Sequence, residues 1–109
     1  MNTTPEHSQF IWHAFESGTT IAQKGSEQGI ILRDEEHQRG ARITLERDGC
    51  TAPFSITCGI YGLFVHTAFA ASEPEALQKY VAMQQRLDQI IASDEHDVSS
   101  QLHDFADAF

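Results

Sequence analysis

The stretch Asp34-Glu35-Glu36-His37 consists of four consecutive metal-capable side chains. On a β-strand Asp34 and Glu36 would share one face, and His37 would stand at the turn that follows. With His66 from a later apolar segment, they supply the donor types of a carboxylate–histidine metal site. No pair among them has a recognised metal-binding spacing. The favoured interpretation is therefore a polar strand end that runs into a solvated turn, and we predict no bound metal and no cofactor.

The other reactive side chains are isolated along the sequence. His66 could act as a general base, but a lone histidine in a strand is more often hydrogen-bonded or part of an interface. Cys50 and Cys58 lie neither at a helix start nor beside a basic residue, so nothing in the sequence stabilises a thiolate. No glycine pattern that cradles a phosphate and no serine nucleophile elbow is present. We assign no catalytic residue, and no motif identifies a family.

Length and charge restrict the class of partner. The 109 residues are expected to form one domain, residues 1–109, around a single core. The formal net charge is −9, and all seven Lys and Arg lie between Lys24 and Arg86, so both ends of the chain are acidic. This argues against nucleic acid and anionic membranes and permits a basic protein partner. The first residues lack signal-peptide features and no apolar run approaches about 18 residues, so we expect a cytoplasmic protein that does not enter a membrane.

Residues 72–92 carry the clearest secondary-structure signal. Ser72 is a good N-cap, Pro74 is tolerated in the first turn, and Glu75 lies three residues after Ser72, as in a capping box. Apolar residues then recur at spacings of three and four, which predicts a long amphipathic helix that packs across a sheet. The predicted core joins Leu77, Val81, Leu87 and Ile91 of this helix to Leu32, Leu45, Ile56 and Val65 of the sheet.

Two segments have the pattern of antiparallel strands. Residues 29–36 and 41–48 flank a predicted two-residue turn at Gln38-Arg39, which would place Glu35 opposite Arg42. Residues 54–71 form either a second hairpin, with its turn at Ile60-Tyr61, or one long bulged strand. In the hairpin version the face toward the helix holds Phe54, Ile56, Cys58, Leu63, Val65 and Phe69. The outer face then holds Ser55, Thr57, Phe64, His66 and Ala68.

Both ends of the chain are predicted to be helical. Residues 1–4 are expected to be disordered and to precede a helix from Pro5 to Gly18, although residues 10–15 also fit a short strand. Residues 93–97 form a short linker to an amphipathic C-terminal helix over 98–109. The fold class is thus α+β. It comprises an antiparallel sheet of four strands, or five if residues 20–23 pair, one long helix packed across it, and short amphipathic helices at the N- and C-termini.

The sequence does not identify a function, and it supports three hypotheses. The first is a non-enzymatic acidic protein-binding or regulatory module, expected to be a homodimer. Its interface residues would be Phe64, His66, Ala68, Leu102, Phe105 and Phe109. The second is a metal-dependent hydrolase that uses Asp34, Glu36, His37 and His66. The third is a small-ligand binder with a pocket between sheet and helix, near Tyr80 and His66.

Overall fold

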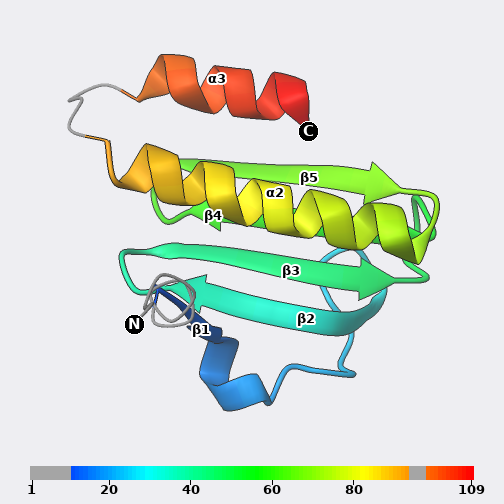
Figure 1. The fold of residues 1–109 in the computed structure, drawn as a ribbon. Helices are drawn as coiled ribbons and strands as arrows, with labels where there is room; N and C mark the ends of the chain where they lie inside the picture. Colours follow the sequence, from blue (N-terminus) through cyan, green and yellow to red (C-terminus); the bar gives the residue numbers. More distant parts are fainter. Residues whose placement is uncertain (1–10, 94–97) are drawn as a thin grey trace, which may run out of the picture.

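The computed structural model describes residues 11–93 and 98–109, and within them the α+β fold class is confirmed (Figure 1). An antiparallel sheet of five strands runs in chain order. The strands are β1 (Trp12–Ala14), β2 (Ile30–His37), β3 (Ala41–Arg47), β4 (Phe54–Ile60) and β5 (Phe64–Ala70). The short 3-10 helix η1 (Phe15–Gly18) follows β1, and the α-helices α2 (Glu73–Ile91) and α3 (Ser99–Ala108) follow β5. No helix in the described part of the chain is long and apolar enough to cross a membrane.

The long helix forms where the sequence predicts it. Ser72 caps α2, and its Oγ accepts a hydrogen bond from the backbone N–H of Glu75 at 3.4 Å. The helix lies across β3, β4 and β5 on one side of the sheet, which we call the helix face (Figure 1). The opposite side is the open face. The buried helix residues are Ala76, Tyr80, Met83, Leu87 and Ile90.

The predicted contact face of α2 is partly wrong. Leu87 packs in the core with Leu45 and Ile56, as predicted. Val81, however, is 45 % exposed, and Val65 is 74 % exposed on the open face. The buried stripe is centred on Tyr80 and Leu87 rather than on Val81, because polar side chains of α2 also face the sheet.

The β2–β3 hairpin turns through three residues, not two. His37 pairs with Ala41, and Gly40 closes the loop with a φ of +100°, a left-handed conformation that favours glycine. This shifts the pairing near the turn by one residue, so Glu36, and not Glu35, lies opposite Arg42. A bulge at residue 32 then restores the predicted register toward the start of β2.

Residues 54–71 form the predicted hairpin, but with a different turn. Ile60 pairs with Phe64, and Ile60 O accepts from Leu63 N at 2.9 Å across a turn in which Gly62 has a φ of +75°. The predicted register is off by three residues, and an odd shift turns every side chain of β5 to the other face. The outer-face prediction is therefore wrong for β5. Phe64, His66 and Ala68 lie on the helix face, and Leu63, Val65 and Phe69 do not.

The predicted N-terminal helix is wrong over residues 12–18, where the chain forms β1 and η1. The alternative of a short strand is confirmed at β1, which pairs with the end of β2 and buries Trp12. This edge contact outweighs the helical spacing of the sequence. Residues 5–10 of that helix prediction, the disorder predicted for residues 1–4, and linker residues 94–97 lie outside the described residues.

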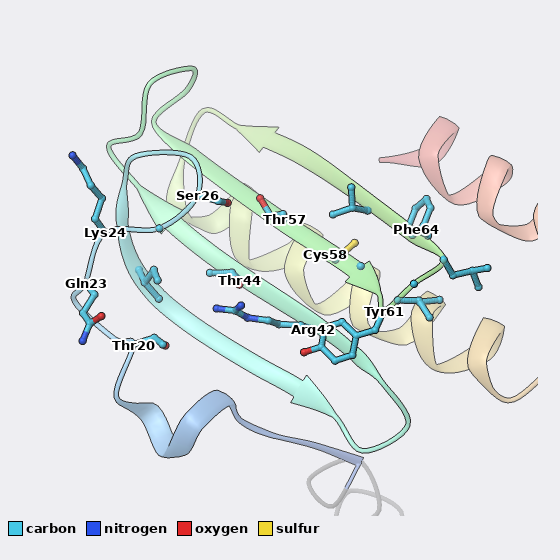
Figure 2. Close-up of a pocket in the computed structure, with 17 residues that line it drawn as sticks. Thr20, Gln23, Lys24, Ser26, Arg42, Thr44, Thr57, Cys58, Tyr61 and Phe64 are labelled. Atoms are coloured by element: carbon cyan, nitrogen blue, oxygen red, sulfur yellow. The ribbon is translucent and has the colours of Figure 1, made fainter.

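The fifth strand is thus β1 and not residues 20–23. That segment makes two backbone hydrogen bonds with Ile31, from Ala22 N at 2.8 Å and to Gln23 O at 2.9 Å. These bonds hold the connection 15–29 against the edge of β2. From there the connection folds over part of the open face, as Figure 2 shows.

The C-terminal helix is confirmed as α3, which packs on its own chain. Leu102 and Phe105 are buried, and the Phe105 ring meets the Phe64 ring edge-on at a centroid distance of 5.5 Å. Since Phe64 points to the helix face, α3 covers the part of β5 that α2 leaves uncovered.

Candidate functional site

The four residues predicted as metal ligands do not come together. Asp34 and Glu36 lie on the open face, whereas His37 and His66 lie on the helix face. No group of three or more His, Cys, Asp or Glu within residues 11–93 and 98–109 is arranged to hold a metal ion. The sheet therefore separates the carboxylates from the imidazoles.

Asp34 is the acceptor at the centre of a hydrogen-bonded cluster on the open face. Its side chain is buried and accepts from Arg42 Nε at 2.9 Å and Arg42 Nη2 at 2.7 Å. The hydroxyls of Thr44 and Thr20 donate to it at 3.0 and 2.8 Å. Both carboxylate oxygens are thus hydrogen-bonded, and the side-on pairing fixes the plane of the guanidinium.

Arg42 is held on a second side by an aromatic ring. The guanidinium carbon lies 3.7 Å from the centroid of the Phe15 ring, which η1 places over it. The hydrogen bond to Asp34 raises the pKa of Arg42, so the group stays charged. Neither bond to Asp34 uses Nη1, and the side chain keeps about a third of its surface exposed.

Beside Arg42 the open face is hollowed into a trough of about 730 Å³ (Figure 2). Its floor is formed by β3 and β4, with Arg42, Thr44, Thr57 and Gly59. One wall is the loop at residues 20–26, and the other is the β4–β5 turn with the start of β5. Figure 2 shows Lys24 at the rim, with its ammonium group pointing away from the trough.

A buried carboxylate fixes the loop wall. Glu46 accepts from Gly29 N at 2.9 Å and from Glu27 N at 3.2 Å. A Cβ on Gly25 would overlap the Glu46 carboxylate, so the loop can approach this closely only with glycine there. The loop wall of the trough is therefore built into the fold.

The opposite wall is apolar and exposed. Leu63 and Val65 are 57 % and 74 % exposed. Tyr61 stands beside them and donates its hydroxyl to Glu36 Oε2 at 2.8 Å. Partial desolvation and this bond raise the pKa of Tyr61 to about 12. The trough thus combines an apolar wall with a hydrogen-bonding floor.

The reactive groups of the lining are not activated. Burial raises the pKa of the Cys58 thiol to about 12, so it remains protonated, and both cysteines are unpaired thiols. Thr57 Oγ1 lies 3.1 Å from Thr67 Oγ1 in a cross-strand hydroxyl pair. Neither the phenol nor the thiol has the lowered pKa of a nucleophile or base.

The helix face holds a polar seam between β2 and α2. Tyr80 donates its hydroxyl to Glu35 Oε1 at 2.6 Å, and Gln84 Nε2 donates to the same oxygen at 3.0 Å. Arg33 lies over the Tyr80 ring, 4.5 Å from its centroid. Burial and the bond to Glu35 raise the pKa of Tyr80. These groups are satisfied by one another, and Tyr80 is not among the residues that line the trough of the open face.

Three of the six predicted interface residues belong to α3 and its end, and the other three lie on the helix face of β5. Ala68, Leu102 and Phe105 are buried, and Phe64, His66 and Phe109 are partly buried. His66 stacks on Phe64 and meets Phe105 edge-on, and its Nε2 is buried without a hydrogen-bond partner in the described residues. Ring contacts join Phe64, His66, Phe105 and Phe109 within one chain. Their role between two copies stays a prediction.

Sequence reasoning did not find the trough. One signal was present: Thr44 and Thr57 each lie between two apolar neighbours, which places their hydroxyls on the face opposite to those neighbours. The loop wall has no such signal, since residues 19–29 have no apolar periodicity. No protein-family model, no curated protein and no solved structure matches the chain.

Proposed function

We propose that this chain is a binding protein that takes a small, largely apolar molecule in the trough of its open face. The supporting observation is the trough itself, whose volume of about 730 Å³ is in the range of small-molecule sites. Such sites combine an apolar lining with a few fixed polar groups, as Leu63, Val65 and the anchored Arg42 do here.

Binding fits the lining better than catalysis. A catalytic site moves pKa values toward neutrality, whereas the pKa values of Cys58 and Tyr61 move away from it. The carboxylate nearest to Arg42 is already used by four donors. We therefore propose that the trough binds its ligand and does not convert it chemically.

Two valines provide a matched test. Val65 lines the trough and Val81 lies on the solvent side of α2, and both are exposed, so neither substitution by glutamate creates a buried charge. The probe is phenylnaphthylamine, an uncharged apolar dye that gains fluorescence in apolar sites. We expect saturable binding of about one dye per chain, lost in Val65→Glu and retained in Val81→Glu. Equal binding by both variants, or none by the wild type, would contradict the proposal.

A protein-binding role is the second candidate, and the exposed apolar residues of the β5 side favour it. Leu63, Val65 and Phe69 form an apolar edge beside the trough, and such edges commonly mark contacts. A second copy would give a homodimer, and the acidic ends of the chain fit a basic protein partner. The molar mass measured by light scattering, for wild type and Val65→Glu, tests the homodimer. A wild-type mass of one chain at high concentration would exclude it.

A further inference from the structure

We infer that the ligand of the trough is an amphipathic anion, an apolar molecule with one acidic group that the Arg42 guanidinium binds. This rests on the proposed function, since it specifies the ligand of the same site. The chain has 16 acidic residues and a net charge of −9, yet the charged side chains among the residues that line the trough are Lys24 and Arg42, both basic. Because Asp34 pairs with Arg42 and Glu36 accepts from Tyr61, the preference for an anion comes from the unused donors of the Arg42 guanidinium rather than from a net positive charge.

The hydrogen bonds of Arg42 leave one edge of the guanidinium for a ligand. A guanidinium has five N–H donors, and Asp34 takes two of them, from Nε and Nη2. The remaining edge, Nη1 with the second hydrogen of Nη2, is a parallel pair of donors that matches a carboxylate or sulfonate. Asp34 and the Phe15 ring already fix the group, so binding costs little conformational entropy.

The shape of the trough sets the apolar part of the ligand. From Arg42 the lining continues past Tyr61 to Leu63 and Val65, so an apolar body can lie along this wall while its acidic group meets the guanidinium. Asp34 offsets part of the Arg42 charge. Lys24 stands at the rim with its ammonium group pointing away from the trough, and its long, flexible stem can turn this charge toward a bound anion. Lys24 makes no ion pair in the described residues.

Two dyes with the same aromatic body separate charge from apolar contact. Anilinonaphthalene sulfonate carries an acidic group, and phenylnaphthylamine is its uncharged counterpart. We expect the sulfonate to bind at least about ten-fold more tightly at low salt, as a charge-assisted pair of hydrogen bonds implies. Equal Kd values would overturn the inference and leave the proposed function standing. Failure of both dyes to bind would overturn both.

Variants then assign the preference to residues. Asp34→Asn with Arg42→Gln removes both charges together, which avoids a buried unpaired carboxylate, and it should abolish the preference for the sulfonate while phenylnaphthylamine still binds. Because that double variant could lose stability, Lys24→Glu is the second test. Lys24 is exposed, and its reversal should weaken sulfonate binding several-fold without changing the melting temperature. Arg86→Glu makes the same charge change on α2 and should leave both Kd values unchanged. A preference that survives in the folded double variant would overturn the inference, and so would a preference unchanged by Lys24→Glu if the double variant does not fold.

Discussion

His37 and Asp88 join β2 to α2 through a hydrogen bond, with His37 Nε2 3.2 Å from Asp88 Oδ1. His37 Nδ1 accepts the backbone N–H of Arg39 at 3.0 Å, so the ring is neutral and carries its proton on Nε2. Trp12 Nε1 donates to the same Asp88 oxygen at 2.9 Å, and its ring meets the imidazole edge-on. Burial lowers the pKa of His37, and the nearby charges of Arg39 and His13 lower it further. The attraction of Asp88 opposes this shift but does not cancel it.

This arrangement predicts a loss of stability in mild acid. The folded state resists protonation of His37, whereas the unfolded chain takes up the proton near its ordinary pKa of 6.5. The contribution of neutral His37 to stability is therefore fully present above that pH. It is lost as the pH falls through 6.5 toward the lower pKa of His37 in the folded state. Burial raises the pKa of Asp88, which acts in the opposite direction, but in the more acidic carboxyl range.

Thermal unfolding between about pH 8 and pH 6, followed by the emission of Trp12, the only tryptophan, measures this slope. His37→Gln should flatten it. His103→Gln, an exposed position on α3, should leave it as in the wild type. An unchanged slope in His37→Gln would contradict the assignment.

Two tyrosines with carboxylate partners give a second prediction. Tyr80→Phe removes a 2.6 Å hydrogen bond to Glu35 from a fully buried position, and we expect a loss of about 1.5–3 kcal/mol in the free energy of unfolding. Tyr61→Phe removes the bond to Glu36 at an exposed position and should cost less than about 1 kcal/mol. Urea unfolding measures both. Equal losses would mean that the buried Tyr80–Glu35 hydrogen bond stabilises the fold no more than the exposed Tyr61–Glu36 bond does.

The long helix could be predicted from the sequence, whereas the two hairpin turns could not. The long helix follows from local signals, since Ser72, Pro74 and Glu75 define its start and no competing pattern interrupts it. The two turns do not follow from local signals, because Gly40 and Gly62 permit loops of either two or three residues. The length of the loop then decides which face of the sheet each side chain takes.

The candidate site was still less predictable. The Asp34–Arg42 pair depends on a bulge and a one-residue register shift, which no local pattern specifies. The loop wall depends on hydrogen bonds from Gly29 and Glu27 to Glu46 of β3, about 20 residues away, and such long-range polar contacts have no sequence periodicity. The same holds for the His37–Asp88 contact.

The core of α2 gives a third prediction. Leu87 is fully buried between α2 and the sheet, and Leu87→Ala should cost about 2–5 kcal/mol through lost burial and the cavity it leaves. Val81→Ala, at a 45 % exposed position of the same helix, should change the free energy of unfolding by less than about 0.5 kcal/mol. Chemical unfolding followed by circular dichroism compares them. A small loss of stability in Leu87→Ala would mean that the buried face of α2 is assigned incorrectly.

The last prediction separates packing within the chain from packing between copies. Phe64 lies against His66 and against Phe105 of α3, so Phe64→Glu puts a carboxylate next to a fully buried ring. We expect a loss of about 2–4 kcal/mol, because the charge must be desolvated or α3 must leave the sheet. Phe69→Glu is the control, since Phe69 lies on the open face of the same strand and is 38 % exposed.

Circular dichroism melts and light scattering on the same samples decide between the two roles. Packing within the chain predicts a lower melting temperature for Phe64→Glu at unchanged molar mass, and a near-normal melt for Phe69→Glu. It also predicts that Phe105→Ala makes the Phe64→Glu substitution less costly, because the two rings contact each other and their effects cannot add. An interface between copies predicts the reverse: Phe64→Glu would halve the mass and leave the fold intact. In that case α3 would belong to the surface that one copy presents to the other, since Phe105 and Phe109 lie in contact along it.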